Sequence, residues 1–276
     1  MDNLPKALEG LVAEARKAAP SKAAATLALK SLDLTSLNDD DTPEKIAALT
    51  KKADQGELGH VAATCVYPKF LTQTFNETAA KGINRATVIN FPSGKGDPDK
   101  TYDDVAAAIK AGANEVDIVL DYESFLKGDV QKAADLLFSA RVAALDGGAK
   151  LKVILESSVF TNSDDLYKAS LLALEYGADF LKTSTGKHTT GGASLEAAAI
   201  MLEAIKDTNS NAGVKFSGGV KTVADAAQYI ALTESMMGKD WITTDKFRFG
   251  ASGVLNDILV VLGKQAAAPA PAKPGY

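Results

Sequence analysis

The 276-residue chain is predicted to fold as a (β/α)₈ barrel of the TIM-barrel class. Eight short apolar runs alternate with longer segments of helical periodicity, which is the element count of that fold. Several of the short runs also begin directly after glycine-alanine, as at Gly112-Ala113, Gly148-Ala149 and Gly177-Ala178. Glycine there ends a helix in a left-handed turn and returns the chain to the next strand. A doubly wound open sheet is the competing architecture.

Residues 1–30 are expected to form a helical extension ahead of the barrel. Leu4, Leu8, Leu11 and Val12 recur at helical spacing, which predicts an amphipathic first helix. Pro20 interrupts this pattern, and a second helical stretch follows up to about residue 30.

The barrel is expected over residues 31–264. Its predicted strands are Ser31–Thr35, Val61–Tyr67, Ala86–Phe91, Glu115–Leu120, Leu151–Leu155, Phe180–Ser184, Val214–Ser217 and Phe247–Ala251. The predicted helices between and after them are Pro43–Ala53, Lys69–Lys81, Thr101–Ala111, Val130–Ala144, Ser163–Tyr176, Ser194–Lys206, Val223–Ser235 and Val254–Leu262. Residues 265–276 are rich in alanine and proline without periodicity, so we expect a flexible C-terminal tail that ends in Tyr276.

Composition and charge narrow the function classes. The chain is 46% hydrophobic and 24% charged, as is usual for a globular protein. A net charge of −5 with scattered basic residues gives a nucleic-acid partner no electrostatic support. No apolar run approaches the length of a membrane span, and the N-terminus has no apolar signal-peptide region. The single cysteine, Cys65, excludes an internal disulfide and fits a reducing compartment, so we expect a cytoplasmic protein.

Two lysines stand inside predicted buried strands. Lys182 lies in Phe180–Ser184, and Lys215 lies in Val214–Ser217. Burial and a neighbouring cation both disfavour the ammonium form, so such a lysine can lose its proton near neutral pH. A neutral amine is a nucleophile that forms a Schiff base with carbonyl compounds. The alternative is that each lysine extends to solvent from a strand end.

The alternation of side chains along the strands brings an acidic residue to these lysines. In the fourth strand, Val116, Ile118 and Leu120 are expected to face the helices, which turns Asp117 inward. By the same alternation Lys182 and Lys215 point inward. Active sites of this fold lie at the C-terminal ends of the strands, so these groups are expected to converge there. A structural ion pair is the alternative role for Asp117.

Glycine-rich loops indicate a phosphate site. Gly218-Gly219-Val220-Lys221 follows the seventh strand, and Gly250-Ala251-Ser252-Gly253 follows the eighth. Backbone N–H groups in such loops bind anions, and barrels of this class often hold phosphate after these two strands. Gly186-Lys187 adds a possible cation. The alternative is that these glycines only allow tight turns and bind no ligand.

Metal and cofactor sites are not expected. His60 and His188 lack metal-ligand spacing, and no Gly-x-Gly-x-x-Gly dinucleotide motif follows a strand. The acidic run 38–41 precedes Thr42-Pro43, which is typical of a capped helix start rather than a cation site. Cys65 is expected to be a buried apolar thiol.

Seven motifs, in this order and spread over most of the chain, resemble the 2-deoxyribose-5-phosphate aldolase family. They are Leu-Asp-Leu-Thr (32–35), Cys-Val-Tyr-Pro (65–68), Asn-Phe-Pro (90–92), Glu-Val-Asp-Ile-Val (115–119), Lys-Thr-Ser-Thr-Gly-Lys (182–187), Val-Lys-x-x-Gly-Gly-Val (214–220) and Arg-Phe-Gly-Ala-Ser (248–252). The resemblance implies a class I aldolase on a (β/α)₈ barrel that cleaves 2-deoxy-D-ribose 5-phosphate to acetaldehyde and D-glyceraldehyde 3-phosphate. It implies no cofactor.

By this resemblance, Lys182 matches the Schiff-base lysine, Lys215 the second lysine, and Asp117 the proton-relay carboxylate. Asp33 matches a polar residue near the substrate hydroxyls, and Tyr276 resembles a C-terminal tyrosine that reaches back to the active site. The matched phosphate-contacting residues are Gly186, Lys187, Gly218, Gly219, Gly250 and Ser252.

The chain departs from the family pattern near the phosphate site. Phe216-Ser217 stands where a Pro-Ala pair is common, and Lys221 stands where an arginine or lysine occurs. Gly253 replaces a frequent second serine, which removes one hydroxyl donor and bears on phosphate affinity rather than on the chemistry.

Other functions remain possible from sequence. A transaldolase-like or keto-acid aldolase would share the Schiff base but differ in its carbonyl and anion pockets. A phosphosugar-binding barrel without chemistry is disfavoured because all three candidate catalytic residues are present. The expected partners are a phosphorylated sugar and aldehydes, and the expected assembly is a monomer or homodimer.

Overall fold

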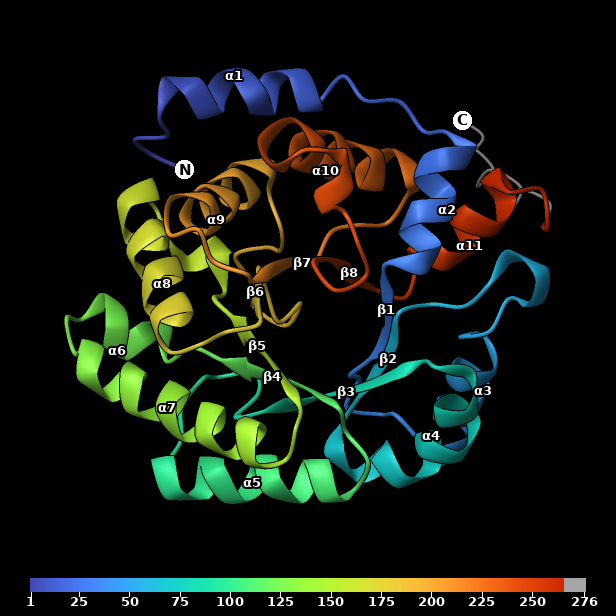
Figure 1. The fold of residues 1–276 in the computed structure, drawn as a ribbon, viewed down its shortest axis with the longest axis horizontal. Helices are drawn as coiled ribbons and strands as arrows, with labels where there is room; N and C mark the ends of the chain where they lie inside the picture. The colour runs from blue at the N-terminus through green and yellow to red at the C-terminus, as the bar shows by residue number, and fades with distance from the viewer. Residues whose placement is uncertain (266–276) are drawn as a thin grey trace, which may run out of the picture.

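Eight parallel strands close into a barrel in the computed structural model, which describes residues 1–265 (Figure 1). Each strand pairs with the next, and β8 pairs with β1. The strands are β1 Leu32–Ser36, β2 Ala63–Val66, β3 Asn84–Ile89, β4 Glu115–Val119, β5 Lys150–Ile154, β6 Phe180–Lys182, β7 Gly213–Ser217 and β8 Phe247–Ala251. The predicted barrel is therefore confirmed, and the open sheet is excluded.

Helices surround the barrel (Figure 1). Those that follow strands are α3 Pro43–Lys51, α4 Leu71–Thr78, α5 Pro98–Lys110, α6 Tyr122–Leu126, α7 Val130–Asp146, α8 Ser163–Glu175, α9 Leu195–Asp207, α10 Val223–Met237 and α11 Val254–Val261. Most agree with the predicted helices to within a few residues. Short 3₁₀ turns extend several loops: η1 Gly56–Leu58, η2 Pro68–Phe70, η3 Ala79–Lys81, η4 Ser157–Val159 and η5 Lys239–Trp241.

The sequence did not predict α6, which begins shortly after the fourth strand. Strand β4 ends at Val119, and Asp121 is the N-cap of α6. Its carboxylate accepts hydrogen bonds from the Ser124 amide at 3.0 Å and from the Ser124 hydroxyl at 2.8 Å. An aspartate at this position satisfies the first free amides of a helix.

Two N-terminal helices lie against the barrel helices. Helix α1 (Lys6–Ala15) packs on α9 and α10, and α2 (Lys22–Lys30) packs on α10 and α11 (Figure 1). The predicted amphipathic face of α1 is confirmed, because Leu8, Val12 and Ala15 are buried.

Strand register gathers charged residues inside the barrel. Lys182 pairs with Lys215, Lys215 with Arg248, and Asp117 with Lys152. Register partners in adjacent parallel strands point to the same side of a sheet. The alternate residues face the helices, as Phe216 shows by stacking on Tyr229 of α10 with ring centroids 4.7 Å apart.

Two smaller sequence predictions are also confirmed. Thr42 caps α3 by accepting a hydrogen bond from the Lys45 amide, and Pro43 occupies its first turn. Cys65 is fully buried beside Leu37 and Val88, and burial is the largest cause that raises the pKa of its thiol.

Among residues 1–265, no helix is long and apolar enough to cross a bilayer. Nor does the described part of the chain hold a metal-binding group of three or more His, Cys, Asp or Glu side chains.

Candidate active site

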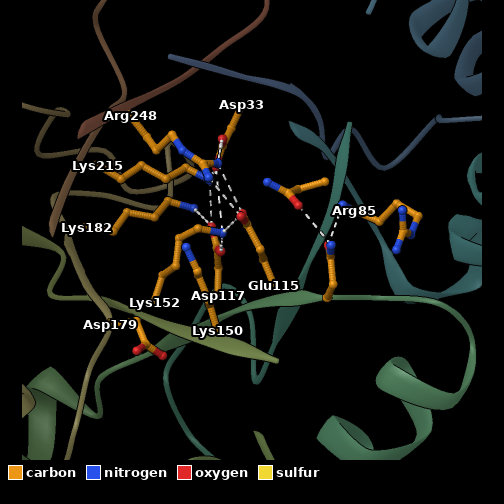
Figure 2. A network of polar contacts seen from close by, with 12 residues as sticks. Asp33, Arg85, Glu115, Asp117, Lys150, Lys152, Asp179, Lys182, Lys215 and Arg248 are labelled. Atoms are coloured by element: carbon orange, nitrogen blue, oxygen red, sulfur yellow. Dashed lines mark hydrogen bonds and ion pairs between the residues drawn. The ribbon is translucent and has the colours of Figure 1, made fainter. Parts of the chain in front are cut away.

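Seven charged side chains meet inside the barrel, and we call them the interior cluster (Figure 2). At most 3% of any of them is exposed. They come from β1, β4, β5, β6, β7 and β8, and they are Asp33, Glu115, Asp117, Lys152, Lys182, Lys215 and Arg248.

Asp117 occupies the centre of the interior cluster. Its Oδ2 lies 2.8 Å from Lys182 Nζ and 2.8 Å from Lys215 Nζ, so one oxygen contacts both amines. Its Oδ1 lies 2.8 Å from Lys152 Nζ. The structure therefore brings together the three residues predicted to be catalytic, with the carboxylate between the two lysines.

The remaining carboxylates hold the other cations. Asp33 Oδ2 lies 2.6 Å from Lys215 Nζ, and Asp33 Oδ1 lies 2.7 Å from Arg248 Nη1. Glu115 contacts Lys152 Nζ at 2.7 Å and Arg248 Nη2 at 2.9 Å. These ion pairs link the residues around Asp117 to one another across the barrel.

A count of charges shows which lysine can be neutral. Three carboxylates (Asp33, Glu115, Asp117) face three cations other than Lys182 (Lys152, Lys215, Arg248), so the cluster is balanced when Lys182 is an uncharged amine. A proton on Lys182 would add an unbalanced charge to this buried cluster, which is unfavourable.

The pKa values follow this arrangement. Burial is the largest cause that lowers the pKa of Lys182; Asp117 opposes it, and Lys215 adds to it. Burial also disfavours the charged form of Lys215, but Asp117 and Asp33 outweigh it and hold that pKa well above its usual value. Burial raises the pKa of the Asp117 carboxyl, but the three lysines together outweigh burial and hold that pKa well below its usual range. Thus Lys182 is the amine that loses its proton most readily, and Lys215 stays an ammonium.

A cavity of about 550 Å³ opens above Lys182 at the C-terminal ends of the strands. Lys182 lines it, whereas Asp117 and Lys215 lie deeper. Loops after four strands form its walls, and their lining residues are Thr35–Asn38, Thr185–Lys187, Ser217–Lys221 and Gly250–Gly253. The cavity therefore joins the Lys182 amine to loops of mostly small, polar or glycine residues.

All six residues predicted to contact phosphate line this cavity, namely Gly186, Lys187, Gly218, Gly219, Gly250 and Ser252. Gly218 and Gly219 have φ values of +77° and +97°, which other residues rarely adopt. A side chain at Gly250 would collide with Ser217 Oγ and Lys215 Cε. Lys221 also lines the cavity, so two lysines, Lys187 and Lys221, lie at its rim.

Of the other two predicted site residues, one lies below the cavity and one is not described. Asp33 is fully buried in the interior cluster and does not line the cavity; Thr35, two residues later on β1, does. The role of Asp33 near substrate hydroxyls stays a prediction. Tyr276 lies outside the described residues.

Sequence reasoning missed Lys152, Glu115 and Arg248. Part of the signal was present, because Lys152 and Arg248 each interrupt an apolar strand pattern, in Leu151-Lys152-Val153 and Phe247-Arg248-Phe249, and Glu115 shares the parity of Asp117. Reading these residues together would have predicted that charged side chains gather inside the barrel, but not which of them pair.

Comparisons with known proteins identify a family and similar folds. Residues 27–255 match the family described as DeoC/LacD family aldolase. A deoxyribose-phosphate aldolase from Agrobacterium fabrum (strain C58) is 44% identical over 257 residues, which cover 92% of this chain and 96% of that protein.

Solved structures share the fold. A candidate deoxyribose-phosphate aldolase from Coccidioides immitis has a TM-score of 0.74 at 25% identity, covering 93% of this chain and 98% of that one. The tetrameric deoxyribose phosphate aldolase from Aeropyrum pernix has a TM-score of 0.74 at 22% identity, covering 94% of this chain and 99% of that one.

Proposed function

The chain belongs to the DeoC/LacD aldolase family, and we propose that it cleaves 2-deoxy-D-ribose 5-phosphate reversibly to acetaldehyde and D-glyceraldehyde 3-phosphate. The observation that carries the proposal is the position of Lys182. Its amine has a lowered pKa, contacts Asp117, and lines a cavity whose other walls are glycine-rich loops. The 44% identity to the Agrobacterium fabrum enzyme supports the choice of substrate.

The chemistry begins with the neutral Lys182 amine. It adds to the C1 aldehyde of the open-chain sugar, and loss of water gives a protonated imine. Removal of the proton from the C3 hydroxyl lets the C2–C3 bond break. Its electrons move to the iminium, leaving an enamine on Lys182 and releasing D-glyceraldehyde 3-phosphate. Protonation of the enamine at C2 and hydrolysis then release acetaldehyde and restore the amine.

Asp117 and Lys215 are proposed to move the protons of these steps. Both amines contact the same oxygen of Asp117, so a proton can pass between Lys182 and Lys215 through one carboxylate. Two carboxylates keep Lys215 charged in the resting site, so this ammonium carries the proton that is proposed to move through Asp117.

The loops above Lys182 are proposed to bind the substrate phosphate. Gly218, Gly219, Ser252, Lys187 and Lys221 line the cavity. The proposed donors are the backbone amides of the first three and the ammonium groups of the two lysines. Converging amides and one or two cations can hold a dianion on a protein whose net charge is −5.

Borohydride trapping tests this function directly. With acetaldehyde, reduction of the imine should leave a stable two-carbon adduct on Lys182. Absence of an adduct would favour a binding protein without chemistry. Adduct formation together with cleavage of keto acids, but not of deoxyribose 5-phosphate, would favour the keto-acid aldolase.

The finer parts of the proposal concern Tyr276, assembly and location. Tyr276 is proposed to assist proton transfer at the enamine carbon, so Tyr276→Phe should slow deuterium incorporation into acetaldehyde while trapping survives. The proposed assembly is a monomer or homodimer, unlike the tetramer described for Aeropyrum pernix, and sedimentation measures it. We place the protein in the cytoplasm, without a nucleic-acid or membrane partner.

A further inference from the structure

Glu156 is a buried carboxylate that the proposed chemistry does not use. It follows β5 by two residues, at the C-terminal end of the barrel, and it is fully buried. Its backbone has φ +53° and ψ +55°, a left-handed conformation that is uncommon for any residue other than glycine. Such backbone conformations outside glycine concentrate at functional sites, where the surrounding structure maintains them.

The chain around Glu156 holds the segment that follows Lys182. The Leu155 amide donates to the Lys182 carbonyl at 2.9 Å, and the Ser157 amide donates to the Thr183 carbonyl at 2.7 Å. Glu156 lies between these two contacts, and its side chain reaches Thr185, which follows Lys182 and Thr183 in the same segment.

The Glu156 carboxylate binds Thr185 twice. Its Oε2 accepts a hydrogen bond from the Thr185 amide at 3.2 Å and another from the Thr185 hydroxyl. The Thr185 hydroxyl oxygen in turn accepts from the Lys187 amide at 3.1 Å. Within residues 1–265, the other Glu156 oxygen, Oε1, has no hydrogen-bond donor. A buried carboxylate held only by neutral donors is costly, which argues that this position requires an acceptor.

This chain of hydrogen bonds selects one amide for the cavity. The Thr185 amide donates to the Glu156 carboxylate, and the Lys187 amide donates to the Thr185 hydroxyl, so both amides already have acceptors within the protein. The amide of Gly186 between them donates to no atom of the described residues 1–265. Gly186 has φ +75° and lines the cavity, so it is the amide of this loop that remains for an anion.

We propose that Glu156 is a positioning residue: through Thr185 it fixes the 185–187 loop so that the Gly186 amide binds the substrate phosphate. Glu156 thereby raises the preference for phosphorylated over unphosphorylated sugar without touching the reacting carbon. The inference rests on the proposed function for the identity of the sugar.

Glu156→Ala removes the acceptor and tests the proposal. We expect the KM for 2-deoxyribose 5-phosphate to rise about 10-fold or more, the loss typical of one hydrogen bond to a charged group. The kcat/KM for unphosphorylated 2-deoxyribose and the yield of the borohydride-trapped adduct should change less than about 3-fold, because Lys182 is untouched. Glu156→Gln keeps an acceptor oxygen and should restore most of the phosphate-dependent loss.

Thr185→Val gives a second test that does not depend on how well Glu156→Ala folds. It removes the hydroxyl at similar size and should reproduce the KM effect. The double variant should lose little more than either single variant, because both break the same contact. Equal losses on both sugars, loss of trapping in Glu156→Ala, or no change in KM for the phosphorylated sugar would overturn the proposal.

Calorimetric titration with inorganic phosphate separates this inference from the proposed function. The parent should bind phosphate more tightly than Glu156→Ala, and Glu156→Gln should resemble the parent. If the parent bound phosphate in this way but failed to cleave deoxyribose 5-phosphate, only the proposed function would fall. Equal phosphate affinities in parent and Glu156→Ala, beside normal cleavage by the parent, would reject the role of Glu156 alone.

Discussion

The interior cluster and the loops above it are built in different ways. The interior cluster consists of charged side chains whose positions are fixed by strand register, and they are almost fully buried. The cavity walls consist largely of loop backbone with left-handed glycines, and their lysines lie at the rim. Low dielectric and balanced charge suit an amine that must stay neutral, whereas exposed amides and rim cations suit a dianion that enters and leaves. Covalent chemistry and phosphate selection should therefore be separable by mutation.

The largest expected effect comes from removing the amine itself. Lys182→Ala should abolish retro-aldol turnover and the trapped acetaldehyde adduct, because no other residue in the proposal forms the imine. Mass spectrometry of the borohydride-reduced protein measures the adduct. Lys187→Met, at the cavity rim, is the control: it should weaken binding of the phosphorylated sugar and still give the adduct. An adduct of normal yield in Lys182→Ala would remove Lys182 from its assigned role.

Asp117→Asn should lower kcat roughly 10²-fold or more, the range usual for a group that transfers protons. The amide keeps the shape of the carboxylate but cannot take a proton from either lysine. It also leaves three cations facing two carboxylates, so thermal unfolding should be recorded beside the steady-state rates. A stable variant with near-normal kcat would reduce Asp117 to a structural ion-pair partner.

Lys215→Met should lose most of the activity at neutral pH and move its pH dependence. The reaction needs neutral Lys182, so activity rises as pH increases through the pKa of that amine. Lys215 helps to lower this pKa. Its removal should raise the pKa of Lys182, and the rising limb of kcat/KM should move to higher pH. If the rising limb of kcat/KM did not move to higher pH in Lys215→Met, burial without Lys215 would account for the lowered pKa of Lys182.

The loops are tested with a charge that opposes phosphate. Ser252→Asp should raise the KM for 2-deoxyribose 5-phosphate roughly 10-fold or more through repulsion of the dianion, and should affect unphosphorylated 2-deoxyribose much less. Ser252→Asn is the neutral control of similar size. Equal losses on both sugars would place the phosphate in another part of the cavity.

The sequence predicted the fold and the loops better than it predicted the interior cluster. Strand–helix alternation and glycine-alanine strand starts identify the barrel, and glycine pairs after strands identify the cavity walls, because both signals are local. Pairing inside the barrel is not local: Asp33 and Arg248 are 215 residues apart in sequence and meet only when β8 closes on β1. The five-residue helix α6 is too short to show periodicity.

Lys152 is the missed residue whose effect is most informative. It contacts Asp117 Oδ1 and Glu115 but not the cavity, so its removal leaves substrate contacts unchanged. Lys152→Met takes one cation from a balanced cluster and leaves Asp117 freer to stabilise a proton on Lys182. The pKa of Lys182 should rise, and the rising limb of kcat/KM should move upward by less than in Lys215→Met, because Lys152 acts through Asp117.

A second variant, which removes a carboxylate instead of a cation, should shift the pKa of Lys182 in the opposite direction. Glu115→Gln removes one carboxylate from the interior cluster, so the rising limb of kcat/KM should move to lower pH. Breaking a buried ion pair costs about 3–5 kcal/mol of folding stability, so both variants should be compared below their unfolding temperatures. Because a loss of stability lowers activity at every pH, only the charge-balance account expects shifts of opposite sign. Shifts in the same direction for Lys152→Met and Glu115→Gln would show that the pKa of Lys182 depends on burial and its nearest contacts, not on the charge of the whole interior cluster.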